Sequence, residues 1–363
     1  MKALVLDPTS PFSEVPRSDT LFGAICWGIR RARGEEQLEE YLAAFADGQP
    51  PFTISSAVPV LDPSDPTYLL PKPRLPGVAG DGELPDARLR ALRTWNRLDY
   101  LPASVFANLA TGNWSRSDVL DDLERGEADG AIDAPRAVEV DGTRYVRVDE
   151  FLLPAAYDTS ASSETGEDEE SGESGGTSVT PPPRPYESGD RLRNAVNRVT
   201  SSTDGQLFTE QRIHVREDAG FGVLARGDVA AVAEGLAVLQ DRGIGGNKSV
   251  GNGQFRMRGV LDVDLPDPEA EHACTLSLCV PREAELGAVA SSGYYEVETR
   301  KGVVADAAGP KDGIWKRRVL ALAEGSLLPT DEVEGHNPVV ADRFEHGVQQ
   351  YGHAFDVGMM AVE

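Results

Sequence analysis

The sequence predicts an α+β fold with two domains, each built on an antiparallel sheet that helices cover on one face. Three observations support this prediction. The chain of 363 residues is long enough for two domains of ordinary size. Strand and helix patterns follow one another in both halves of the chain, and a polar acidic segment separates the two series. We therefore expect two ferredoxin-like (RRM-like) domains at 1–157 and 191–363, joined by a segment at 158–190.

The N-terminal series begins with an alternating strand at 2–7. Ser18 and Asp19 then predict the start of a helix, because apolar residues recur behind them at helical spacing. A second helix is expected at 35–46, where carboxylates occupy the first turn and a glycine follows the end. An Asp-Gly pair within 138–145 predicts a tight β-hairpin.

The C-terminal series is expected to start with two strands, at 207–216 and 221–226. A helix capped by Asp228 should follow and end at a glycine-rich loop, from which the strand at 254–263 leaves. More strands are expected at 275–280, 294–300 and 319–322. The glycine-rich loop at 243–253 therefore belongs to the predicted C-terminal domain.

The segment at 158–190 is rich in Ser, Gly, Glu and Pro, and it carries nine carboxylates against the single Arg184. Such a composition cannot bury enough apolar surface to offset the entropy of ordering the chain. We expect an acidic disordered linker or an exposed insertion.

The formal charge of −25 argues against an extended basic surface of the kind that usually binds nucleic acid. The chain has 60 carboxylates and 29 arginines but only six lysines, so the acid is spread over the whole sequence. We interpret this composition as adaptation to a salty cytoplasm, in which screening still lets a local cationic cluster bind phosphates.

Location and redox state follow from simpler patterns. The sequence has no apolar run of about 18 residues, and its first residues do not form a secretory signal, so we expect a cytoplasmic protein. Cys26, Cys274 and Cys279 are too few and too scattered for a disulfide framework. A zinc site with His272 is not expected, because two of these cysteines would point to opposite faces of a strand.

The loop at 243–253 contains five glycines together with Lys248 and Ser249. Glycines let backbone amides approach an anionic group closely. A Walker loop is excluded because Asn247 stands where that motif needs glycine. A dinucleotide fingerprint is excluded because this loop follows a helix and opens a strand.

In its order and placement, this loop resembles the glycine-rich loop of the RAMP superfamily of CRISPR proteins. Other segments resemble the subunit of the type III-A (Csm) complex that caps the 5′ handle of the guide RNA. These segments are 18–27, 70–73, 197–198, 207–208, 323–326 and 351–355. The resemblance covers most of the chain outside the acidic segment.

The resemblance implies an RNA-binding subunit of an antiviral ribonucleoprotein that has no catalysis, cofactor or metal of its own. Its implied partners are the crRNA, through the 5′ handle, a large polymerase-like subunit and a backbone RAMP subunit. Amides of Gly245, Gly246 and Gly251 are expected to receive phosphates, and Lys248 to neutralise one. The full set of expected RNA-binding residues is Gly243, Gly245, Gly246, Asn247, Lys248, Ser249, Gly251, Gly253, Arg191, Arg193, Asn197, Arg198, Ser18 and Asp19.

Two other functions stay open. Some RAMP relatives cut precursor guide RNA without metal, typically with a histidine or tyrosine near the first helix. The first histidine here is His214, so such a site would need Tyr41, Tyr68 or Tyr100; His214 and His353 are more simply structural. A subunit that contacts only other proteins is the remaining possibility.

Overall fold

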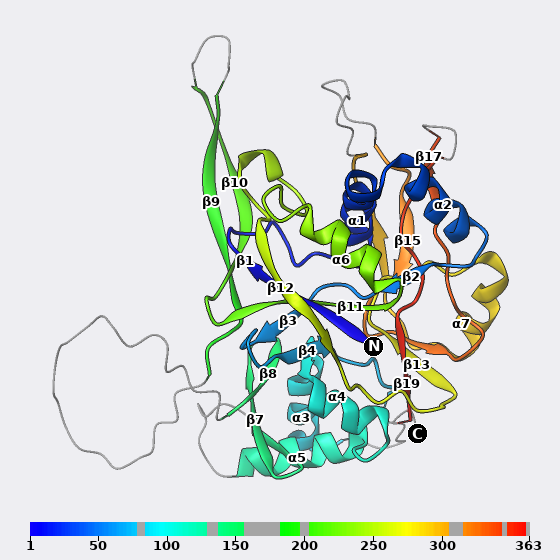
Figure 1. Cartoon of the computed structure of the whole chain (residues 1–363). Coiled ribbons are helices and arrows are strands. Elements are labelled where there is room, and N and C mark those ends of the chain that lie inside the picture. Colours follow the sequence, from blue (N-terminus) through cyan, green and yellow to red (C-terminus); the bar gives the residue numbers. More distant parts are fainter. Residues whose placement is uncertain are drawn as a thin grey trace, which may run out of the picture.

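The computed structural model of the chain is a mixed α+β structure with mostly antiparallel sheets, as predicted (Figure 1). It describes residues 1–77, 84–128, 137–155, 182–196, 203–304, 315–342 and 347–360. Within these ranges, no helix is both long and apolar enough to cross a membrane.

The largest sheet has ten strands in the order β12-β1-β11-β3-β4-β5-β8-β7-β6, with β2 also paired to β11. Their bounds are β1 (Lys2–Pro8), β2 (Phe52–Ile54), β3 (Val58–Leu61), β4 (Thr67–Pro71), β5 (Tyr100–Pro102), β6 (Ala137–Val140), β7 (Thr143–Val148), β8 (Phe151–Pro154), β11 (Ala219–Gly227) and β12 (Phe255–Asp262). Strand β1 lies between β11 and β12 and pairs with both in antiparallel register.

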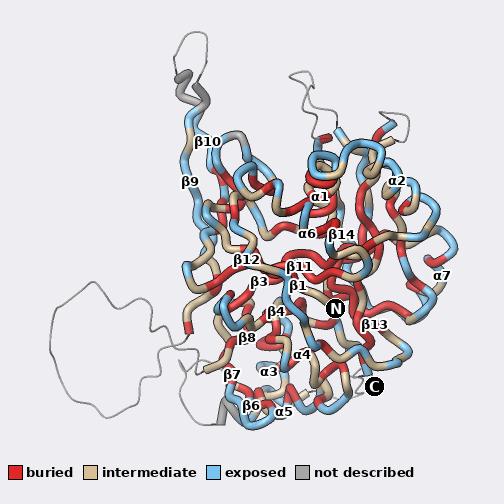
Figure 2. The backbone as a smooth tube through the Cα atoms, viewed as in Figure 1, coloured by how far each residue is buried: buried red, intermediate tan, exposed pale blue. Residues whose placement is uncertain are grey.

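Strand β1 is buried on both faces, which explains its continuous apolar sequence. Leu4 and Leu6 pack into one core cluster with the first helix, whereas Ala3 and Val5 pack into a second cluster on the other face. Figure 2 shows β1 and β11 as buried segments in the middle of the molecule. The two clusters place the hydrophobic core on both sides of this sheet.

Helices α1 (Ser18–Arg33) and α6 (Val229–Ala237) contribute to the cluster around Leu4. They touch where Gly28 faces Gly235, and a Cβ at Gly28 would overlap the carbonyl oxygen of Gly235. The order β1, α1, β2 with β3, β11, α6, β12 is a β-α-β-β-α-β arrangement, with sheet order β12-β1-β11-β3. The glycine-rich loop is the connection from α6 to β12.

This pairing differs from the predicted division at 1–157 and 191–363. Strand β1 hydrogen-bonds to β11 and β12, which come after the predicted linker, so both halves of the sequence build one sheet. The glycine-rich loop therefore belongs to the unit that contains β1. The physical reason is a long insertion between β3 and β11, which separates strands that pair in space.

The insertion extends the sheet through β4 to β8 and adds three helices. These are α3 (Asp86–Asn96), α4 (Ala103–Ala110) and α5 (Arg116–Ala128), which lie together beside β4 and β7 in Figure 1. The predicted hairpin at 138–145 is confirmed as β6 and β7, and its turn residues Asp141 and Gly142 both have positive φ. Helix α2 (Glu35–Ala46) is also confirmed.

A long hairpin projects from the body of the molecule (Figure 1). It consists of β9 (Tyr186–Val196) and β10 (Thr203–Val215), and a bridge between Phe12 and Ile213 joins its base to the body. Strand β9 begins inside the segment at 158–190 that we expected to be linker. The part of that segment at 158–181 lies outside the described residues.

The C-terminal part contains three small sheets and helix α7 (Leu286–Ser292). The strands are β13 (His272–Thr275) with β16 (Leu327–Pro329) and β19 (Asp356–Met359), β14 (Val297–Arg300) with β15 (Val319–Leu322), and β17 (Val339–Ala341) with β18 (Val348–Gln349). Cys274 and Cys279 are fully buried and unpaired.

Candidate nucleic-acid interface

The base of the glycine-rich loop is closed by backbone hydrogen bonds. The amide of Ile244 donates to the carbonyl of Gly253 (2.9 Å), and the amide of Gly253 donates to Pro11 (2.8 Å). Gly243 and Gly253 have φ values of 78° and 77°, and a Cβ at Gly253 would overlap the carbonyl oxygen of Ile244. These two predicted residues therefore shape the loop rather than contact a ligand.

The tip of the loop exposes a row of backbone amides. Residues 245–248 are consecutive, and their N–H groups have no acceptor within the described part of the chain. Gly245 has a φ of 86°, and Asn247 is left-handed before the short 3-10 turn η1 (Lys248–Val250). Successive unpaired amides near a left-handed residue form a concave anion-binding arrangement. The tip is therefore chemically suited to a phosphate.

Gly251 does not contribute an amide to this row. Its N–H donates to the carbonyl of Lys248 at 3.1 Å, so the phosphate contact that we expected there is replaced by a bond within the loop. Its φ of 85° explains why the turn needs glycine, although a Cβ there would meet no neighbouring atom.

A buried carboxylate fixes the loop through hydrogen bonds to two of its side chains. Glu210 on β10 accepts hydrogen bonds from the side chains of Asn247 and Asn252. The same carboxylate forms ion pairs with Arg193 (2.7 Å) and Arg212 (3.0 Å). The structure thus brings the predicted residues Asn247 and Arg193 together, but both side chains bind Glu210. They position the loop, and the sequence analysis missed the carboxylate that they share.

Lys248 is the cation of the loop tip. Its side chain is exposed and forms no ion pair among the described residues. Partial burial of the ammonium group, and then the positive charge of Arg31 at the end of α1, lower the pKa of Lys248. Two cations thus lie near enough for one to act on the other, which favours an anionic ligand.

The face of the β9–β10 hairpin that contacts the loop also carries an exposed aromatic ring. Phe208 is directly opposite Arg193, and side chains two residues apart on a strand share a face, so Phe208 lies on the face of Glu210. Phe208 is 49% exposed, and Arg191 on the same face is exposed without an ion pair in the described ranges. An exposed aromatic beside cations is a stacking platform for bases. The residue was not singled out from the sequence.

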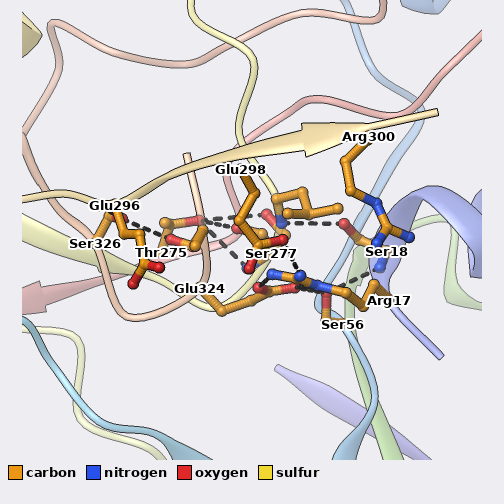
Figure 3. Close-up of polar contacts among 12 residues, drawn as sticks. Arg17, Ser18, Ser56, Thr275, Ser277, Glu296, Glu298, Arg300, Glu324 and Ser326 are labelled. Atoms are coloured by element: carbon orange, nitrogen blue, oxygen red, sulfur yellow. Dashed lines mark hydrogen bonds and ion pairs between the residues drawn. The ribbon is translucent and has the colours of Figure 1, made fainter. Parts of the chain in front are cut away.

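Ser18 and Asp19 do not join this site. Ser18 is fully buried; its amide donates to Ser56 (2.8 Å) and its hydroxyl accepts from the amide of Leu278 (3.1 Å), as Figure 3 shows in part. Asp19 accepts two hydrogen bonds from Arg300, at 3.0 and 3.1 Å. Both residues connect α1 to the C-terminal part, so direct contact with RNA is not supported for them.

Beside Ser18, Arg17 forms ion pairs with Glu298 and Glu324 (Figure 3). Ser56 donates a further hydrogen bond to Glu324. Burial by itself lowers the pKa of Arg17, but the hydrogen bonds and negative charges of the two glutamates outweigh it and raise that pKa. We call Arg17, Ser18, Ser56, Glu298 and Glu324 the Arg17 cluster. It is a structural connection between distant parts of the chain.

The remaining predicted residues are only partly described. Asn197 and Arg198 lie outside the described residues, and the side chain of Ser249 is not described. Of the tyrosines considered for RNA cleavage, Tyr41 donates a hydrogen bond to Asp228 at the end of α6 opposite the loop. Tyr68 lies on β4 and Tyr100 on β5, and burial raises the pKa of both.

Comparison with known proteins gives consistent matches. Residues 268–359 match the family model for the CRISPR Csm4 C-terminal domain. The CRISPR system Cms protein Csm4 of Thermococcus onnurineus (strain NA1) is 27% identical over 366 residues, covering 98% of this chain and 96% of that protein.

Two solved structures share the fold over almost the whole chain. A chain of the Csm1-Csm4 cassette in complex with pppApA matches with a TM-score of 0.56 at 21% identity, covering 99% of this chain and 97% of that one. A chain of the Csm3-Csm4 subcomplex of the type III-A CRISPR-Cas interference complex matches with a TM-score of 0.59 at 16% identity, covering 99% of both chains. The family-model match over 268–359 and the full-length likeness to a Csm4 protein support a Csm RAMP subunit.

Proposed function

We propose that this chain binds the 5′ handle of the guide RNA in a type III-A CRISPR ribonucleoprotein and has no catalytic activity of its own. The observation that carries the proposal is the row of four unpaired amides at 245–248 beside the exposed Lys248. Backbone amides and a lysine are groups that contact phosphates, and phosphate contacts fix the register of a bound strand.

The surrounding residues suit single-stranded RNA. A phosphate at the loop tip would place the next nucleotide near the hairpin face that holds Phe208, where a base can stack on the ring. Glu210 would keep the loop in its binding conformation, because its carboxylate accepts a hydrogen bond from the side chain of Asn247. Binding would then need little reordering of the protein, which favours affinity.

The same proposal includes two protein partners. The matched relatives are described in complexes of Csm1 with Csm4 and of Csm3 with Csm4. We infer that this chain docks a large polymerase-like subunit and a backbone RAMP subunit in the cytoplasm. We also infer that the β-α-β-β-α-β unit is a ferredoxin-like domain, whereas the small C-terminal sheets do not repeat its strand order in the described ranges.

Binding of labelled RNA tests the proposal. The chain, assembled with its proposed partners, is titrated with an RNA that carries the 5′ handle, and Lys248→Ala is compared with the parent. Loss of the phosphate contact made by the ammonium group should weaken binding roughly tenfold. Arg125→Ala is a matched control, because Arg125 is an exposed cation on α5 whose ion pair with Asp122 lies far from the loop in sequence.

Parent-like affinity in the Lys248→Ala variant would remove the support for the loop as the RNA site. The same purified chain is incubated with repeat RNA without metal. Cleavage in this assay would replace the proposed function with guide processing.

A further inference from the structure

A second cationic stretch of sequence lies in the C-terminal part of the chain, and the structure describes its residues 300–304 and 315–318. Residues 300–318 carry six basic and two acidic side chains, in a protein of net charge −25. This stretch contains three of the six lysines in the whole sequence. Such a local excess of positive charge in an acidic chain indicates a surface for an anionic partner.

An exposed tryptophan lies at the centre of this surface. Trp315 forms a β-bridge with Val303 and is 65% exposed. The ammonium nitrogen of Lys301 lies 4.9 Å from the centre of the indole ring, over one of its faces. The other face of the indole is the one on which a base can stack.

The cations around Trp315 are available for phosphates. Lys301 and Arg318 are exposed, and Lys316 is half-buried. In the part of the chain that the structure describes, none of these three side chains forms an ion pair with a carboxylate. We call Lys301, Trp315, Lys316 and Arg318 the Trp315 patch.

Helix α1 connects the Trp315 patch to the glycine-rich loop. Arg300, which precedes Lys301 in the sequence, donates two hydrogen bonds to Asp19 at the start of α1. Towards its other end, α1 packs at Gly28 against Gly235 of α6, the helix that precedes the glycine-rich loop, and burial and then the charge of Arg31 lower the pKa of Lys248 in that loop. From Asp19 to Arg31 the helix rises about 18 Å, a span that a single strand of several nucleotides can cover.

The surface between the two ends carries further groups suited to RNA. Trp27 is half-buried on α1, with the guanidinium of Arg30 5.4 Å from its ring centre. A Cβ placed on Gly23 would meet no atom within 4 Å, so this turn of the helix faces open space. The path along α1 is therefore not blocked at Gly23.

We propose that the Trp315 patch is a second binding surface for the same single-stranded RNA, which runs from the glycine-rich loop along α1 to Trp315. This inference rests on the proposed function and adds where the strand continues. RNA is favoured over a protein partner because lysine is depleted at protein interfaces, and two of the three cations of the patch are lysines. A polyanion, in contrast, neutralises three cations that have no ion pair among the described residues, while a base stacks on the indole.

Oligonucleotides of two lengths test the inference. RNAs of about two and about twelve nucleotides that share the same 5′ sequence are titrated against the parent and Trp315→Ala, because a dinucleotide is too short to span about 18 Å. Trp315→Ala should bind the longer RNA at least about fivefold more weakly than the parent does, and it should bind the shorter RNA as tightly as the parent. Trp315→Phe should restore most of the affinity, since it keeps an aromatic face.

A double variant, Lys301→Ala with Arg318→Ala, tests the charges. For the longer RNA, the slope of log affinity against log salt should fall by about 1.4, since each lost phosphate contact of a single strand accounts for about 0.7. Arg317→Ala is the matched control, because Arg317 is exposed nearby but paired with Asp342.

The Lys248→Ala variant is measured beside these variants. If it weakens both RNAs while Trp315→Ala weakens neither, the proposed function stands and the Trp315 patch is not an RNA surface. If Trp315→Ala loses a partner subunit and keeps RNA affinity, the patch is a protein interface and the inference is overturned. If Lys248→Ala has no effect on either RNA, the proposed function itself fails.

Discussion

The glycine-rich loop and the Arg17 cluster show how similar residue types take opposite roles. Both regions combine cations, small polar side chains and a carboxylate, and residues from or next to both were predicted to bind RNA. At the loop, the amides of residues 245–248 have no partner among the described residues, and Lys248 is exposed. In the Arg17 cluster, every charge has a partner from a distant part of the chain. Unsatisfied, accessible groups mark the proposed binding surface, and satisfied, buried groups mark the structural connection.

Arg17→Ala is the strongest way to test this distinction. The variant leaves Glu298 and Glu324 without their cation, and breaking such a largely buried ion pair costs about 3 kcal/mol or more. We expect a large decrease in the free energy of unfolding, measured by urea denaturation. Arg125→Ala, which removes a largely exposed cation from a pair three residues apart on α5, should change that free energy by less than about 1 kcal/mol. Equal effects of the two changes would show that the cluster is not a structural connection.

A lower pH should also decrease the free energy of unfolding, through the buried His353 in the C-terminal part. Burial, and then the charges of Arg282 and His336, lower the pKa of His353 to about 4. Its pKa in the unfolded chain is about 6.5, so the unfolded state binds the proton more readily. The contribution of His353 to the free energy of unfolding is fully present above about pH 6.5. It falls by about 2–3 kcal/mol as the pH decreases towards 4.

Urea denaturation at several pH values measures this loss. In His353→Phe the part of the decrease due to His353 should disappear, so the variant curve should be flatter than that of the parent over the same pH interval. A parent curve with the same slope as the variant would contradict the buried neutral histidine.

Alanine substitutions at two glycines of the loop distinguish a residue that is packed at the loop base from one that is open at the loop tip. Gly253→Ala should destabilise the protein by about 2 kcal/mol, because φ is 77° and the new Cβ overlaps Ile244. Gly245→Ala has a similar φ but open space around it, so about 1 kcal/mol is expected. Thermal unfolding of the two variants, measured side by side, gives the order. The reverse order would show that the loop base is not closed as described.

Asp19→Asn should have the smallest effect. It removes one charge opposite Arg300 but keeps a hydrogen-bond acceptor, so about 1 kcal/mol of stability should be lost. RNA affinity of the folded variant, measured by fluorescence anisotropy, should equal that of the parent. A loss of RNA affinity without a loss of stability would return Asp19 to the binding surface.

Local patterns predicted most of the individual elements. The strand at 2–7, the helices at 18–33 and 35–46 and the hairpin at 138–145 follow from periodicity and turn residues, and the structure has all of them. The pairing of β1 with β11 and β12 was missed, because those partners lie more than 200 residues away and no local pattern encodes that choice. The insertion between β3 and β11 hid the continuity of the sheet.

The position of the candidate site was predictable from the sequence, but the contacts within it were not. Glycine density and Lys248 located the loop, and its exposure agrees with that prediction. Glu210 was invisible among 60 carboxylates, so the inward roles of Asn247 and Arg193 could not be foreseen. Ser18 and Asp19 were expected to cap α1, but the N-cap position is Arg17 and both side chains face the C-terminal part.

The contact between Gly28 and Gly235 has a consequence for any mutational scan of this protein. Helix α6 leads directly into the glycine-rich loop, and the two helix backbones meet at this point without a side chain between them. A methyl group at position 28 would push α6 away from α1 and shift the loop, although Gly28 itself is buried between the two helices. A scan that scores only loss of guide binding would therefore misassign this helix crossing as part of the RNA footprint.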